Sequence, residues 1–149
     1  MSARKSATVL AAIAVVFLLA ACAPRPYALR FEPNGAPMTE PSAKQLAAAT
    51  DISSLASVST TDAPALRDTA LKELRTRGTL GVRAADLLTT GFPEHTASVP
   101  VLVRVCTVNG TASIVVVEAF GDAGKTLTHR RLWVFDRATG AVTLAASFS

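Results

Sequence analysis

Few residues in this sequence could carry out chemistry. The chain has two cysteines and two histidines in 149 residues, and it lacks a glycine-rich phosphate-binding loop, a paired-carboxylate motif and a serine nucleophile elbow. Cys106 lies 11 residues after His95 and 23 residues before His129, a spacing that matches none of the close-paired zinc motifs. No family-type signature surrounds Cys106, so a Cys–His nucleophilic pair has no local support. The sequence therefore predicts no catalytic residue, no metal site and no cofactor.

Long apolar runs are also scarce, and only residues 6–24 form one. These 19 uncharged residues are long enough to cross a bilayer as a helix, which needs about 20 residues. The order of the parts is instead typical of an export signal, because Arg4 and Lys5 precede an Ala-, Val- and Leu-rich segment and small residues follow it. An uncleaved helical anchor and plain secretion remain as alternatives.

The export signal ends in Leu19-Ala20-Ala21-Cys22, which resembles the lipobox of bacterial lipoproteins. In that family, diacylglycerol is attached to the Cys thiol, and a dedicated signal peptidase cuts just before the Cys. The resemblance implies that residues 1–21 are a signal peptide, that cleavage separates Ala21 from Cys22, and that Cys22 carries acyl chains such as palmitate. Two acyl chains hold a protein stably on a membrane, so no spanning helix would be needed.

The resemblance also implies a location for the mature protein. Cys22 would anchor it in a membrane with its domain on the extracytoplasmic side. Ala23 stands where lipoproteins retained in the inner membrane have Asp, which favours the outer membrane in a cell with two membranes. In a cell with one membrane, the anchor would lie in the outer leaflet of the cell membrane.

The charge balance excludes one class of partner. The whole chain has a net charge of +4, but removing Arg4 and Lys5 with the signal leaves 13 Lys and Arg against 11 Asp and Glu, or +2. This is too balanced for nucleic-acid binding, which needs a concentrated basic surface. A local basic cluster remains as a candidate contact for anionic lipid or an acidic envelope polymer, the alternative being a solvated strand. Its members are Lys125, His129, Arg130 and Arg131.

Residues 22–60 are predicted to be the lipidated N-terminus and a tether. Residues 23–41 contain five prolines, each of which removes an amide donor and disfavours helix. Ser42 is a candidate cap for a short helix, but the apolar face of this helix would be thin. That face would consist of Leu46 and Ala49.

The compact domain is predicted at residues 61–149, with helices first and strands after them. A helix is expected between Asp62, a suitable N-cap, and Gly78, and a shorter one over residues 82–91. From Val99 the apolar period becomes two, which indicates strands. The predicted fold is α+β, with one or two N-terminal helices packed on a four-stranded antiparallel meander sheet. The helix stripe expected to face the sheet consists of Leu66, Ala70, Leu71 and Leu74.

Two hairpins define the expected register of that sheet. The turn Asn109-Gly110 is a strong hairpin signal, and a two-residue loop pairs Cys106 with Ser113. Cys106 then lies within an apolar strand, which favours its burial. In the second hairpin, over residues 127–149, pairing of Asp136 with Ala141 would place several apolar residues on one face. They are Trp133, Phe135, Val142, Leu144 and Phe148.

Arg104 and Glu118 are charged residues inside apolar strands, and this register places them on opposite faces. Each is therefore expected to find a partner on another element or to reach an edge of the core.

Taken together, the sequence features favour a small binding or assembly module of the cell envelope, not an enzyme. A ligand-binding domain with a pocket between helix and sheet is the alternative, and an enzyme that depends on Cys106 is the least favoured.

Overall fold

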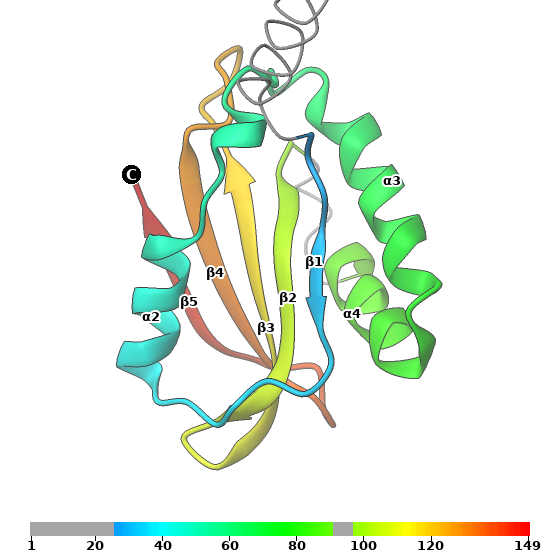
Figure 1. The fold of residues 1–149 in the computed structure, drawn as a ribbon, viewed down its shortest axis with the longest axis vertical. Helices are drawn as coiled ribbons and strands as arrows, with labels where there is room; N and C mark the ends of the chain where they lie inside the picture. The colour runs from blue at the N-terminus through cyan, green and yellow to red at the C-terminus, as the bar shows by residue number, and fades with distance from the viewer. Residues whose placement is uncertain (1–25, 91–96) are drawn as a thin grey trace, which may run out of the picture.

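The computed structural model describes residues 26–90 and 97–149, so the signal peptide, Cys22 and His95 lie outside the described residues. The α+β class is confirmed, since three α-helices accompany a five-stranded mixed sheet in this part of the chain (Figure 1). The helices are α2 (Glu40–Ala49), α3 (Ala63–Arg75) and α4 (Gly78–Thr90), with a 3₁₀ turn η1 (Ser53–Leu55). The strands are β1 (Arg30–Glu32), β2 (Val99–Val108), β3 (Thr111–Phe120), β4 (His129–Asp136) and β5 (Val142–Phe148).

The strands lie side by side in chain order, from β1 to β5. The predicted meander is confirmed for β2 to β5, but the sheet has a fifth strand, β1, which runs parallel to β2. The β2–β3 hairpin has the predicted register, with Cys106 opposite Ser113. Its turn has positive φ angles at Asn109 (49°) and Gly110 (82°), which is the geometry that a two-residue hairpin loop requires.

The β4–β5 hairpin departs from the predicted face. The Asp136 amide donates to the Ala141 carbonyl at 2.8 Å, as expected. A register shift then follows, because Phe135 pairs with Val142 whereas Val134 pairs with Leu144. One extra residue in a strand turns every later side chain to the other face. Leu144 and Phe148 therefore share a face with Val134, and the prediction that they lie beside Trp133 is wrong.

Helices cover both faces of the sheet (Figure 1). On one face, α3 and α4 pack on apolar side chains of β2, β3 and β4, including Val103, Ile114 and Phe135. On the other face, α2 packs on Leu102, Val115 and other members of a second apolar cluster. The small residues Ala43 and Ala47 are fully buried there, so that α2 can lie close to the strands.

The tether predicted over residues 22–60 is contradicted where the structure describes it. Residues 30–55 contain β1, α2 and η1, and the backbone of residues 35–38 also bonds to β2, for example from the Gly35 amide to the Val105 carbonyl at 2.8 Å. The prolines did not prevent this, because Pro41 lies in the first turn of α2, where proline is tolerated. The cap of α2 is Thr39, whose hydroxyl accepts from the Ser42 amide, and not Ser42.

A third apolar cluster closes one end of the domain. It joins η1 and the start of α3 to the ends of β2 and β3 and to the β3–β4 connection, through residues such as Leu55, Val99 and Leu127. Backbone hydrogen bonds hold these segments together, since the Leu127 amide donates to the Val58 carbonyl at 3.0 Å and the Thr60 amide to the Lys125 carbonyl at 2.9 Å.

None of the helices in the described ranges has the length and apolarity needed to cross a bilayer.

Candidate functional site

The four predicted anion-contact residues do not form one patch. Arg130 and Arg131 are neighbours on β4, so their side chains point to opposite faces of the sheet. Lys125 is exposed in the β3–β4 connection, and His129 begins β4 with its ring 5.4 Å from the ring of Phe120. The cluster is therefore divided between two faces and a turn.

The two arginines of this cluster also have partners within the domain. The Arg130 Nε donates to the Thr50 carbonyl at 2.7 Å, and Thr50 is the C-cap of α2, where a cation is favourable. The Arg131 guanidinium lies 4.1 Å from the centre of the Phe120 ring, within the range of a cation–π contact. Of the four, Lys125 is thus the one whose exposed position best fits an anionic surface.

Arg104 and Glu118 lie on opposite faces, as predicted, and each has a partner from another element. Arg104 contacts Glu32 of β1 through its Nε, and Glu32 also contacts Arg30 at 2.6 Å. The hydrogen bond from Arg104 is the main reason that the pKa of Glu32 lies below its ordinary value. These three charges fix β1 along the edge of β2.

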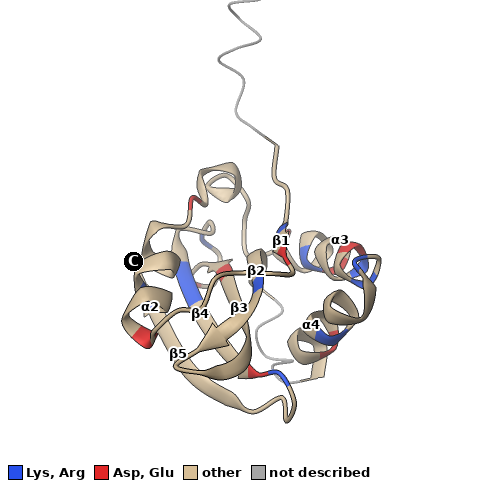
Figure 2. Cartoon of the chain, turned by 60° about the horizontal axis from the view of Figure 1, so that its bottom comes forward, with Lys and Arg blue, Asp and Glu red and all other residues tan. Residues whose placement is uncertain are grey.

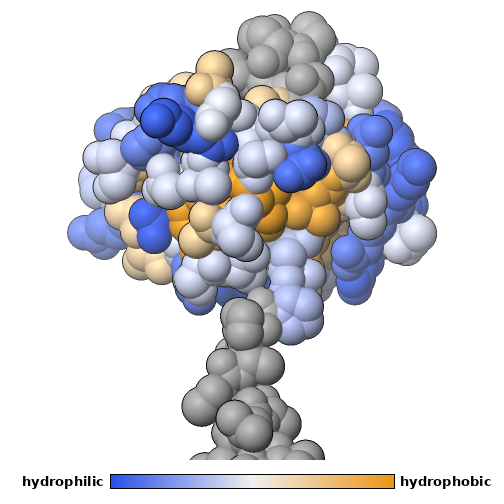
Figure 3. All heavy atoms as spheres, turned by 90° about the horizontal axis from the view of Figure 1, so that it is seen from above, coloured by the Kyte–Doolittle hydropathy of each residue, from blue (hydrophilic) through white to orange (hydrophobic). Residues whose placement is uncertain are grey.

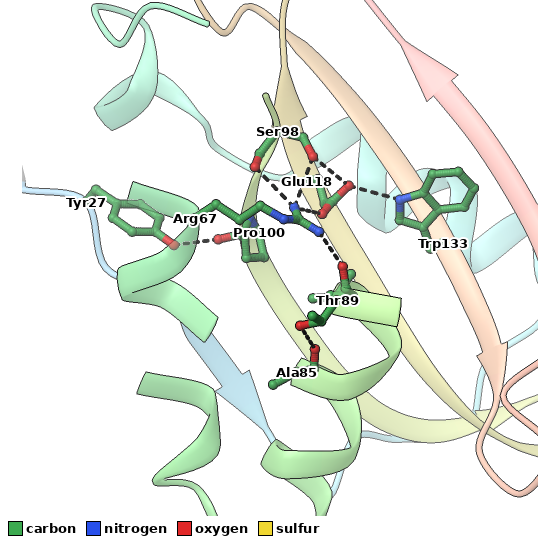
Figure 4. A network of polar contacts seen from close by, with 9 residues as sticks. Tyr27, Arg67, Ala85, Thr89, Ser98, Pro100, Glu118 and Trp133 are labelled. Atoms are coloured by element: carbon green, nitrogen blue, oxygen red, sulfur yellow. Dashed lines mark hydrogen bonds and ion pairs between the residues drawn. The ribbon is translucent and has the colours of Figure 1, made fainter. Parts of the chain in front are cut away.

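The partner of Glu118 is Arg67 of α3, and this pair is fully buried (Figure 4). The Arg67 Nη1 lies 2.5 Å from Glu118 Oε1, and their side chains are 4% and 1% exposed. Arg67 also donates to the carbonyls of Ser98 and Leu88, at 3.1 and 2.9 Å. The other carboxylate oxygen of Glu118 accepts from the Ser98 hydroxyl at 3.1 Å and from Trp133 Nε1 at 3.0 Å.

This network ties the end of α4 and the start of β2 to the middle of the sheet. Among the described residues, no buried side-chain nitrogen or oxygen lacks a hydrogen-bond partner. Because both charged groups are hydrogen-bonded on several sides, the arrangement holds α3, α4, β2 and the middle of the sheet in place. Helical spacing could have placed Arg67 on the buried face of α3, because Arg67 precedes Ala70 by three residues and Leu71 by four. Leu66 of the predicted stripe is partly buried and packs against the third apolar cluster, which includes residues of β2 and β3.

Cys106 is buried, as predicted, with 8% of its surface exposed. Burial raises the pKa of its thiol, which disfavours the reactive thiolate. Its opposite residue on β3 is Ser113, whereas His129 lies opposite Phe120, seven residues further along that strand. Seven residues of strand span about 23 Å, so Cys106 and His129 cannot form a nucleophilic pair. Within the described ranges, no three residues of metal-ligating type are grouped.

A hollow of about 450 Å³ lies between α4 and the β4–β5 turn. Its walls include Arg83, Leu87 and Phe135. The guanidinium of Arg83 donates to the carbonyls of Arg137 and Ala138, at 3.3 and 3.2 Å. The hollow is lined by residues of α4, of the β4–β5 turn and of the strand ends beside it, and a ligand-binding role for it stays a prediction.

The two edges of the sheet differ in how they are protected. β1 has only three residues, two of them charged, and Pro33 follows it, all of which are features that discourage pairing with another strand. β5 has seven residues, VTLAASF, with neither charge nor proline. Figure 2 shows β5 without charged residues, whereas α3 and α4 carry many. Strand β5 is therefore the candidate interaction surface of this domain.

The side chains of β5 form two rows. Thr143, Ala145 and Ser147 are exposed on the face away from α2. Leu144, Ala146 and Phe148 are partly buried on the α2 face, where they pack against the second apolar cluster. An added strand next to β5 would thus find apolar side chains on one face and small, exposed ones on the other.

No protein-family model, curated protein or solved structure matches this sequence.

Proposed function

We propose that this chain is a bacterial lipoprotein anchored through acyl chains on Cys22, and that its folded part is a binding or assembly module of the cell envelope. The observation that carries the anchoring is the sequence Leu19-Ala20-Ala21-Cys22 directly after a charged segment and an apolar one. The domain would then lie on the extracytoplasmic side of the cell membrane or, in a cell with two membranes, of the outer membrane, as Ala23 favours.

The binding role is supported by strand β5. An uncharged edge strand offers backbone donors and acceptors to an extended segment of another protein, and alternate side chains then give selectivity. The partner that fits is an envelope protein with an exposed segment in which apolar and polar residues alternate. Its apolar residues would extend the row of Leu144, Ala146 and Phe148.

Fractionation of cells tests the anchoring. We expect the wild-type protein in the membrane fraction and the Cys22→Ser variant in the soluble fraction or retained with its signal uncleaved. A Cys22→Ser variant that is processed and stays in the membrane like the wild type would contradict lipid anchoring at this residue.

Two matched lysine substitutions test the binding surface. Ala145→Lys places a charge on the exposed face of β5, and Ala65→Lys places the same charge on the exposed face of α3. A complex extracted in mild detergent and sized on a native gel should be lost with Ala145→Lys and retained with Ala65→Lys. Retention of the complex in both variants would contradict a role for β5.

The hollow between α4 and the β4–β5 turn supports a second candidate function, which is binding of a small molecule. A thermal-shift screen with lipids and small metabolites tests it. A ligand that raises the melting temperature of the wild type but not of a Leu87→Arg variant would support this alternative. The absence of any shift across a broad panel would count against it.

A further inference from the structure

The folded domain begins close to the proposed anchor. Pro26 is the first residue that the structure describes, and it follows Cys22 by four residues. Four residues of extended chain reach about 14 Å, whereas the tether first expected over residues 22–60 would reach on the order of 130 Å. A lipidated Cys22 would therefore hold one particular end of the domain at the membrane surface.

This end is identified by the segments that lie around Pro26. The start of β1, the turn η1 and the β3–β4 connection share the upper end of the domain in Figure 1. Tyr27 donates its hydroxyl to the Pro100 carbonyl at 2.6 Å, which fixes the chain there. We call this surface, made of residues 26–30, 51–61 and 121–128, the anchor-proximal end.

The anchor-proximal end has both apolar and polar side chains. Figure 3 views it from above and shows hydrophobic residues in a band between hydrophilic ones. Tyr27 and Val58 of this surface are partly buried and pack against the third apolar cluster. Amphipathic surfaces of this kind suit the boundary between lipid headgroups and water.

Polar groups at this end can meet headgroup phosphates. A hollow of about 570 Å³ next to Pro26 is lined by Arg30, Thr50, Asp51, Ser53 and Ser54, among others. The side chain of Arg30 is 60% exposed although it also contacts Glu32, and Lys125 is exposed in the β3–β4 connection. Asp51 and Asp122 lie at the same end, so the surface is nearly balanced in charge and fits phosphodiester headgroups without needing an anionic membrane.

We infer that the anchor-proximal end lies against the lipid headgroups of the membrane that holds Cys22, with Arg30 and Lys125 next to headgroup phosphates. This inference rests on the proposed lipidation of Cys22. It adds which surface faces the bilayer and leaves the opposite end, with the turns at residues 109–110 and 136–140, directed away from it.

Headgroup-dependent quenching tests this orientation. The acylated full-length product is reconstituted in phosphatidylcholine vesicles in a Cys106→Ser background, with a thiol fluorophore on Ser57→Cys at the anchor-proximal end or on Ala138→Cys at the opposite end. Both sites are exposed. A nitroxide attached to the lipid headgroup should quench the fluorophore at residue 57 several-fold more than the one at residue 138. Equal quenching, or stronger quenching at residue 138, would overturn the inference.

The intact mass of the same samples separates this result from the proposed function. Acylated protein with equal quenching at the two positions refutes the orientation alone. Protein without acyl chains refutes the anchoring and, with it, the orientation. Replacing both Arg30 and Lys125 by Gln should lower the quenching of the fluorophore at residue 57, whereas the control Lys44→Gln on α2 should leave it unchanged. Equal quenching in the unsubstituted protein, the double variant and the control would refute the phosphate contacts.

Discussion

Removing Arg67 should destabilise this domain far more than removing an arginine on its surface. Arg67→Met keeps most of the side-chain volume but leaves the carboxylate of Glu118 buried without its cation. Breaking a buried ion pair by removing one partner costs about 3–5 kcal/mol, because the remaining charge is uncompensated. Domains of this size have a free energy of unfolding of about 5–15 kcal/mol, so the loss would be a large part of the total.

Arg75→Met provides the matched control on the same helix. Arg75 contacts Asp86 at 2.5 Å, but the two side chains are 41% and 49% exposed. An exposed pair contributes about 0–1 kcal/mol, because water screens it. Urea unfolding of the chain from residue 22 onward, with Cys22→Ser, measures both variants. We expect the midpoint for Arg67→Met to fall by about 2 M and that for Arg75→Met to change little.

A double variant separates the charge from the packing. Arg67→Met with Glu118→Gln removes both charges and still leaves an amide oxygen to accept from Trp133 Nε1. It should therefore be more stable than Arg67→Met alone by about 1–3 kcal/mol. The reasoning would be refuted if Arg67→Met cost no more than Arg75→Met, or if the second substitution restored nothing.

Three further predictions concern single residues. Tyr27 is the only tyrosine, and its partial burial raises the pKa of its phenol, so ultraviolet titration should show no phenolate near pH 10 in the folded protein. The free energy of unfolding should stay constant up to that pH and fall above it, and ordinary titration near pH 10 without unfolding would contradict the hydrogen bond from this hydroxyl to the Pro100 carbonyl. Cys106 should react with a thiol reagent at pH 8 slowly when the protein is native and rapidly in denaturant, and equal rates would contradict its burial. Gly81→Ala should lower the melting temperature although alanine favours helix, because the alanine Cβ would lie 2.1 Å from the Leu74 carbonyl oxygen of α3. A higher melting temperature would contradict this close approach of α3 and α4.

The sequence predicted the parts of the fold that depend on local patterns. Asn109-Gly110 determined the turn, the loop length and the register of the β2–β3 hairpin, because few residues adopt the positive φ angles that such a turn needs. The α3 stripe likewise followed from helical spacing. The β4–β5 register was predicted only up to the bulge, since no residue there marks an extra position in the strand.

The missed parts depend on contacts between segments distant in the chain. Residues 30–32 were predicted to be part of a tether, because a strand of three residues is too short to show a periodic pattern. They form β1 because they pair with residues 102–104 at the edge of β2. The thin apolar face of α2 is likewise sufficient only because the sheet covers Ala43 and Ala47. The candidate surface on β5 was predictable as an uncharged strand, but its position at the sheet edge required the topology.

The most direct test of lipid anchoring at Cys22 is the intact mass of the protein extracted from membranes, compared with that of the Cys22→Ser variant. Lipid anchoring predicts the mass of residues 22–149 plus two or three acyl chains, and the loss of this species in the variant. An unmodified mass that retains residues 1–21 would contradict it. Residues 6–24 would then be a spanning helix, and the inference that a lipidated Cys22 holds the anchor-proximal end at the membrane would lose its basis.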